Sequence, residues 1–112
     1  MSARAGTATV DRTFAALADP VRRKSVELLA ARPHRAGELA AAVGVSPAVM
    51  SRHLRVLRDA KLVDEEHPEF DARVRIFSLR TQPMAALKTW LADAEAGWSQ
   101  QLLAFKTHVE RG

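Results

Sequence analysis

The chain has 112 residues, of which 47% are hydrophobic, and it contains no cysteine. That length is enough for one domain with a hydrophobic core and leaves little room for a second, and the missing cysteines exclude disulfide bonds and thiolate metal sites. The formal net charge of +4 and the pI near 10.3 suit a polyanionic partner, although many ordinary soluble proteins carry a similar excess.

The N-terminal part of the chain predicts a lead followed by a first helix. Residues 1–8 are expected to form a mobile lead, and residues 9–112 a single domain. The lead lacks the apolar stretch of a secretory signal, and no apolar run in the chain is long enough to span a bilayer, so we expect a cytoplasmic protein with no membrane partner. The first helix is expected from about Val10 to Ala18, with Phe14 and Leu17 on its apolar side.

A second helix is predicted to begin at the pair Asp19-Pro20 and to extend to about Ala31. Asp is a favourable N-cap, and Pro is tolerated at the first helical position because its missing N–H would have no partner there. The cap is followed by three basic residues, Arg22, Arg23 and Lys24. We expect these side chains to be solvated or paired with acids across a dimer, with a phosphate contact from one of them as the alternative.

Residues 36–60 have the pattern of two helices joined by a tight turn, the helix-turn-helix that reads DNA. The apolar stripe of the first helix consists of Leu39, Ala40 and Val43. Gly44 suits the left-handed residue that ends this helix, and Ser46 and Pro47 supply the N-cap and first-turn proline of the next one. In that second helix three apolar residues are expected to face the core, namely Met50, Leu54 and Leu57.

The exposed side of the second helix is basic, since residues 47–61 contain four Arg or Lys residues against one Asp. The candidate DNA contacts on this helix and its cap are Ser46, Pro47, Ala48, Val49, Ser51, Arg52, His53, Arg55 and Arg58. Arg35, in the loop before the first helix of the pair, is a further candidate for a phosphate contact. An ordinary helical hairpin with a solvated basic face is the alternative interpretation.

The start of this recognition helix is apolar. Pro47, Ala48 and Val49 offer no side-chain hydrogen bonds to bases, so specificity there depends on thymine methyl groups and DNA shape. We expect Ser51, Arg52 and His53 to provide most of the direct readout. A bidentate contact with guanine and a simple phosphate contact are equal alternatives for Arg52. For His53, the alternative is packing against the first helix of the pair.

Two strand-like runs, LVDEEH at 62–67 and RVRIFSLR at 73–80, flank the sequence PEFDA and predict a β-hairpin, or wing, directly after the recognition helix. The second run has apolar residues on both faces, which favours a bulge or helix packing and leaves the register open. Four acids make the tip acidic, namely Glu65, Glu66, Glu69 and Asp71. Only Arg73 and Arg75 remain to reach phosphate, so we expect the wing to contribute weakly or through its second strand alone.

Apolar residues recur every three or four positions from Met84 to Val109 and predict one amphipathic helix at about 83–109. A helix of about 26 residues is roughly 40 Å long, too long for the hairpin and three short helices to cover. We therefore expect its far end to pack on the first helix and on a second subunit, forming a symmetric homodimer. The expected dimer interface consists of Phe14, Leu17, Leu87, Trp90, Leu91, Ala94, Trp98, Leu102 and Phe105.

Three stretches, FAALADPVRR at 14–23, GELA at 37–40 and SRHLRVLRDA at 51–60 followed by LV at 62–63, together resemble the ArsR/SmtB family of winged-helix transcriptional regulators. The resemblance covers roughly residues 11–80. It implies a homodimeric repressor that binds a promoter, expected to be an inverted repeat, and releases it when an effector arrives. Lys61 departs from the family, which often has Gly there, so a left-handed residue would cost about 1 kcal/mol or the helix ends differently.

The expected fold is mainly α with a small β-hairpin, a winged helix-turn-helix with a long C-terminal dimerisation helix. Without a catalytic constellation in the sequence we expect no enzyme and no cofactor. The four histidines form no close-spaced pair, so we expect no metal, with Asp93 and His108 meeting across an antiparallel dimer as the alternative. The function predicted is sequence-specific DNA binding by a transcriptional regulator, and the alternative is a protein-interaction module that has lost it.

The signal that controls such a repressor is open at this point. One hypothesis is a small apolar effector held between the C-terminal helices near Trp90 and Trp98. Control by the concentration of the protein alone is equally compatible with the sequence.

Overall fold

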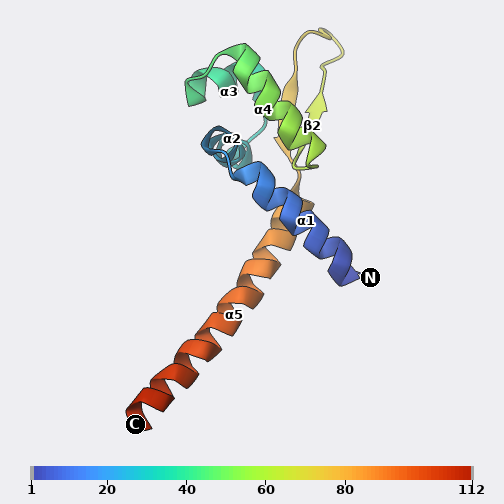
Figure 1. Cartoon of the computed structure of the whole chain (residues 1–112). Coiled ribbons are helices and arrows are strands. Elements are labelled where there is room, and N and C mark those ends of the chain that lie inside the picture. Colours follow the sequence, from blue (N-terminus) through green and yellow to red (C-terminus); the bar gives the residue numbers. More distant parts are fainter. Residues whose placement is uncertain (1, 112) are drawn as a thin grey trace.

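The computed structural model describes residues 2–111, which form five helices and a small antiparallel sheet (Figure 1). The helices are α1 (Ser2–Leu17), α2 (Pro20–Ala31), α3 (Ala36–Val43), α4 (Pro47–Asp59) and α5 (Thr81–Arg111). The strands are β1 (His34–Arg35), β2 (Val63–Glu66) and β3 (Ile76–Leu79). The predicted mainly helical fold, with its hairpin after the recognition helix and its long C-terminal helix, is confirmed.

The bounds of the outer helices differ from those expected. Helix α1 begins at Ser2 instead of near Val10, so residues 2–8 belong to it. The sequence of these residues, SARAGTA, contains no large apolar side chain and has no apolar period, which is why no helix was predicted. Their expected mobility stays a prediction, and residue 1 lies outside the described residues. Helix α5 extends beyond its predicted bounds at both ends.

The caps of the inner helices match the sequence signals. The carboxylate of Asp19 accepts hydrogen bonds from the backbone N–H groups of Val21 at 2.8 Å and Arg22 at 3.3 Å, at the start of α2. Gly44 ends α3 in the left-handed conformation with φ +83°. The hydroxyl of Ser46 accepts from Val49 N–H at 3.2 Å and starts α4. The turn between α3 and α4 is therefore set by local sequence.

Helix α4 ends in a Schellman motif that is closed by a lysine. Leu62 N–H donates to the carbonyl of Leu57 at 3.0 Å, and Lys61 N–H donates to that of Arg58 at 2.9 Å. Lys61 has φ +67°, the left-handed conformation that Gly usually occupies. The side chains of Leu57 and Leu62 are both fully buried, and their burial holds the lysine in this conformation.

The core lies between α2, α3, α4 and the sheet. Its fully buried members include the three apolar residues predicted to face inward from α4, together with Leu39, Leu62 and Phe77. Two buried polar side chains have partners: Ser25 Oγ donates to Val21 O at 2.9 Å, and the ring of His34 lies 3.1 Å from Leu28 O. The core thus fixes α4 against α2, α3 and the hairpin.

The sheet has the order β1-β3-β2, with both pairs antiparallel. In the hairpin Val63 pairs with Leu79 and Glu65 with Phe77. The short strand β1 was not predicted, because two residues carry no alternation, and it pairs with the other side of β3. The apolar residues on both faces of β3 are at least half-buried, since Phe77 is fully buried and Ile76 and Leu79 are half-buried, and helix α2 contacts this strand.

Helix α5 leaves the rest of the molecule as a long arm, and α1 crosses it near its base (Figure 1). The rings of Phe14 and Trp90 meet there edge to face, with centroids 5.2 Å apart. The expectation that the far end of α5 packs on the first helix is wrong, because the crossing lies in the first third of α5. None of the helices within residues 2–111 is long and apolar enough to cross a membrane.

Candidate nucleic-acid interface

A groove lined by arginines lies between the recognition helix α4 and the wing. Its lining residues are Ser51, Arg52, Arg55 and Arg58 of α4, Glu65 of β2, and Arg75 just before β3. The groove has a volume of about 370 Å³. The structure therefore brings together five of the residues predicted from sequence to contact DNA, and adds one acid that was not predicted there. We call this feature the arginine groove.

Glu65 ties the two sides of the arginine groove together. Its Oε2 accepts a hydrogen bond from Arg58 Nη1 at 2.6 Å, and its Oε1 accepts one from Arg75 Nε at 2.6 Å. Arg75 Nη1 also donates to Ser51 Oγ at 2.8 Å, and its guanidinium lies over the ring of Phe77, 5.1 Å from the centroid. Both Arg58 and Arg75 are thus engaged within the protein.

Charge and burial act against each other at Glu65, whose side chain is 11% exposed. Burial acts to raise the pKa of this carboxyl, but the hydrogen bond and charge of Arg75 and the charge of Arg58 together lower it below its ordinary value. Glu65 was expected to belong to the acidic tip. The period of a strand could have placed it correctly, because Glu65 shares a face of β2 with the buried Val63.

Arg52 and Arg55 are the free cations of the arginine groove. Both side chains are exposed, and neither forms an ion pair with any residue in the described range 2–111. Their charge is therefore available to a phosphate or a base. At the start of α4, Ser46, Pro47 and Ala48 are exposed and Val49 is half-buried. The apolar start of the recognition helix that the sequence predicted is therefore accessible on the surface.

The remaining predicted cations continue this basic surface. Arg35, Arg73 and Arg75 line a second hollow of about 240 Å³ beside the start of α3, so Arg75 belongs to both hollows. Arg73 is 91% exposed, and its Nε lies 3.2 Å from Asp71 Oδ1. Hydrogen bonds from the Arg73 backbone and side chain lower the pKa of Asp71 below its ordinary value. The surface thus extends from α4 across the wing to the loop before α3.

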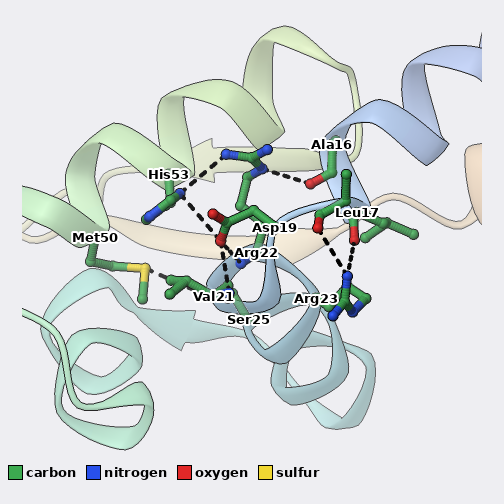
Figure 2. A network of polar contacts seen from close by, with 10 residues as sticks. Ala16, Leu17, Asp19, Val21, Arg22, Arg23, Ser25, Met50 and His53 are labelled. Carbon is green, nitrogen blue, oxygen red and sulfur yellow. Dashed lines mark hydrogen bonds and ion pairs between the residues drawn. The ribbon is translucent and has the colours of Figure 1, made fainter.

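His53 points toward Asp19 and Arg22 at the start of α2 (Figure 2) and is not among the residues that line the arginine groove. Its side chain is 19% exposed, with Nδ1 3.9 Å from an Asp19 oxygen. Arg22 Nη1 lies 3.3 Å from the same Nδ1, and because a guanidinium can only donate, Nδ1 is the acceptor. The alternative of packing on the first helix of the pair is not favoured, because the polar partners of His53 are Arg22 of α2 and Asp19 at its cap. Direct base readout by His53 stays untested, and this orientation does not favour it.

Arg22 and Arg23 hold the end of α1 (Figure 2). Arg22 Nε donates to Ala16 O at 2.6 Å, and Arg23 Nη1 donates to Leu17 O at 2.8 Å. Arg22 is half-buried against α1 and not solvated as expected, whereas Arg23 is exposed as expected and also donates to the end of α1. Pairing with acids across a dimer stays a prediction. The last carbonyls of a helix lack intrahelical donors, and the sharp turn into α2 brings both guanidinium groups within reach of them. Only spatial proximity reveals these caps.

Asp19 links this junction to the N-terminus of α2. Burial acts to raise the pKa of its carboxyl, but backbone N–H donors from Arg22 and Val21, with the nearby charge of Arg22, lower it below its ordinary value. Asp19 therefore caps α2 as an ion, the form that also suits the positive end of the helix dipole.

The other histidines lie apart from one another. His34 is in the core, the Nδ1 atom of His67 lies 3.1 Å from Val74 O in the hairpin, and His108 is exposed on α5. Within residues 2–111, no three His, Asp or Glu side chains are grouped closely enough to hold a metal ion. Each of these three histidines therefore lies in a different part of the structure, and they do not share a site within the described residues.

The similarity of the chain to known proteins shows which family it belongs to. The sequence pattern described as "Bacterial regulatory protein, arsR family" matches residues 19–65, from the cap of α2 into β2. The chain is 38% identical over 100 residues to the HTH-type transcriptional regulator Rv2034 of Mycobacterium tuberculosis, a match covering 89% of this chain and 88% of that relative. The chain belongs to the arsR family of bacterial regulatory proteins.

Further relatives of this arsR-family protein agree. It is 27% identical over 84 residues to the transcriptional repressor SdpR of Bacillus subtilis, covering 75% of this chain and 90% of SdpR. The solved structure of an ArsR-like transcriptional regulator from Rhodococcus sp. RHA1 superposes with a TM-score of 0.72 at 25% identity, covering 90% of this chain and 92% of that one. The arsR-family protein is a DNA-binding transcriptional regulator with a winged helix-turn-helix.

Proposed function

We propose that this regulator acts as a homodimer that represses transcription by binding an inverted-repeat operator. The observation that supports the dimer best is the uncovered apolar face of α5, where Trp98 is 59% and Leu102 68% exposed. Further exposed apolar side chains on the same helix are Leu91, Leu103, Phe105 and Val109. An apolar surface of this extent on a helix about 46 Å long is costly to leave in water, and a second copy of the same helix covers it symmetrically.

The predicted interface divides into two groups. Phe14 and Trp90 contact each other within one chain, and Leu17 packs on the chain's own core. On α5, Leu87 and Ala94 are half-buried. The exposed apolar residues of the predicted interface are Leu91, Trp98, Leu102 and Phe105. We propose that the exposed residues of α5 make the main contact between subunits. The crossing of α1 and α5 lies at the start of this contact surface.

The dimer also determines the form of the DNA site. A two-fold axis places the two α4 helices in successive major grooves, roughly 34 Å apart, so each reads one half of an inverted repeat. Arg55, Arg35 and Arg73 supply phosphate contacts and hence affinity, while Arg52 and Ser51 face the bases. Pro47 and Ala48 select thymine methyl groups and groove shape at the start of the helix.

Repression, in place of activation, is proposed from the likeness to SdpR, a repressor by its name. The groove offers Arg and Ser side chains and a single carboxylate, that of Glu65, which is already bonded to two arginines. We therefore propose a regulator and not an enzyme, acting in the cytoplasm where promoter DNA is found. An effector would act at the apolar surface of α1 and α5, because a ligand held between subunits changes the angle between the two recognition helices.

The test is fluorescence anisotropy on the protein's own upstream DNA and on a scrambled duplex, each titrated over a salt series. We expect nanomolar, salt-dependent binding with a clear preference for the upstream DNA. Arg52→Ala should weaken operator binding by about 1 to 3 kcal/mol and relax base preference, whereas Arg55→Ala should weaken binding to both duplexes equally and reduce the salt slope by about 1. Equal weak binding of the wild type to both duplexes would contradict the proposal and favour a protein-interaction module.

A further inference from the structure

Glu65 is an acid at the centre of a surface that binds a polyanion, which needs an explanation. Charge alone predicts that a carboxylate there weakens DNA binding. Yet Glu65 is nearly buried and accepts two hydrogen bonds of 2.6 Å from Arg58 and Arg75. Such short bonds between charged groups hold side chains in one geometry. The acid therefore reduces the net charge of the groove and orders two of its arginines.

We infer that Glu65 is a positioning residue for base recognition, which holds Arg75 against Ser51 so that the Ser51 hydroxyl is presented to the DNA as a hydrogen-bond donor. This inference rests on the proposed DNA binding. It assigns Arg75 a role different from the phosphate contact expected from its sequence position.

The geometry of Arg75 suits that role. Its Nε donates to Glu65 and its Nη1 to Ser51 Oγ at 2.8 Å, so the planar fork bridges the wing and the recognition helix. Its guanidinium carbon lies 5.1 Å from the ring centroid of Phe77, a fully buried core residue. Three contacts in three directions leave the guanidinium a single orientation.

The chemistry of Ser51 follows from this contact. A hydroxyl has one proton to donate and two lone pairs. Arg75 occupies a lone pair, and no hydrogen bond formed within residues 2–111 uses the proton. The proton is therefore free for a base edge in the major groove, where guanine N7 and O6, adenine N7 and thymine O4 are acceptors. Cytosine presents its amino group there, which can reach only the one lone pair that Arg75 leaves free. A hydroxyl that already accepts from a cation is a weaker acceptor and a stronger donor, so cytosine is disfavoured at the position that Ser51 faces.

The chain supplies a matched control. Glu66 is the next residue of β2, carries the same charge and points to the opposite face, where its side chain is exposed and forms no ion pair with residues 2–111. Glu66→Gln and Glu65→Gln therefore remove the same charge from the same strand. Only Glu65→Gln removes the charge that orders Arg75.

The experiment is selection of duplexes from a random-sequence pool by the full-length wild type and both variants, followed by anisotropy on the selected site and a scrambled duplex. We expect Glu66→Gln to tighten binding to both duplexes slightly and to leave base preference unchanged. Glu65→Gln should bind the scrambled duplex more tightly, lose the preference against cytosine at one position of each half-site, and reduce the ratio of specific to non-specific affinity about tenfold.

Arg75→Lys tests the inference independently and keeps the net charge, in case Glu65→Gln does not fold. A lysine is a point charge without the fork, so we expect the same loss of preference at the same position, with thermal stability measured alongside. If the wild type selects a site and either folded variant keeps the wild-type preference, the positioning role is overturned. If the wild type selects no site at all, it is the proposed DNA binding that fails.

Discussion

Replacing Lys61 by glycine should stabilise the protein, although the change removes a whole side chain. Lys61 closes the Schellman motif at the end of α4 with φ +67°, a conformation that costs a residue with a Cβ about 1 to 2 kcal/mol. Glycine removes that cost but gives the unfolded chain additional freedom, worth about 0.4 to 1 kcal/mol. The free energy of unfolding should therefore rise by about 0.5 to 1 kcal/mol.

Urea unfolding measures this difference, with all variants at one protein concentration because the proposed dimerisation would contribute to stability. For a slope of roughly 1.5 kcal/mol/M the midpoint should rise by about 0.5 M. Lys61→Ala is the control, because it removes the same charge and keeps the Cβ that causes the strain. A Lys61→Gly protein no more stable than Lys61→Ala would refute the reasoning.

Gly44 offers the reverse experiment at the end of α3. Its φ of +83° is left-handed too, and a Cβ built there meets no atom within 4 Å. Gly44→Ala should therefore lower the free energy of unfolding by about 0.5 to 1 kcal/mol, which is the cost of a left-handed residue less the reduced freedom of the unfolded chain, without any clash. The same urea assay checks this value, and an unchanged midpoint would show that conformation at this turn costs less than we infer.

Three further predictions concern the dimer, the α1 cap and pH. Trp98→Ala should raise the dissociation constant of the proposed dimer at least about tenfold, since burying an indole contributes about 1.5 kcal/mol or more to association. Sedimentation over a concentration series measures this constant, and an unchanged value would place the interface elsewhere. Arg23→Ala should lower the free energy of unfolding by about 1 kcal/mol by releasing the α1 carbonyls, whereas Lys24→Ala, whose pair with Glu27 is exposed, should change it little. The pKa of Glu65 is lower in the folded protein than its ordinary value of 4.5, so the ionised carboxylate stabilises the fold at pH values above 4.5. This contribution is lost as the pH falls through the lowered pKa. Urea unfolding over a pH series should therefore show the stabilities of wild type and Glu65→Gln converging toward acid pH.

The parts of the fold that the sequence predicted well are those determined within a few residues. Three local signals each determine a neighbouring helix end, namely Asp19-Pro20, Ser46-Pro47 and Gly44. These helix ends therefore do not depend on residues far away in the sequence. The apolar period of α4 also predicted which side chains are buried, because a long amphipathic helix has one face that can pack on a core.

The parts that were missed depend on contacts between segments far apart in sequence. Arg22 and Arg23 read as surface charge until the turn after α1 brings carbonyls to them, and β1 is a strand only because β3 lies beside it. Glu65 is the most instructive case, because its charge placed it with the acidic tip and its position on β2 placed it in the arginine groove. For a charged residue on a short strand, the face of the strand was the better guide.

The same contacts connect the two halves of the regulator. Helix α1 packs on the base of α5 through Phe14 and Trp90, and its last carbonyls are held by arginines of α2. One of these, Arg22, also donates to His53 on the inner side of α4 (Figure 2). A rotation of α1 together with α5 must therefore either break the bonds of Arg22 or move His53, and hence the recognition helix, along with it. The orientation of the DNA-reading helix is thus tied to the arm through three consecutive side-chain contacts, without any ligand between them.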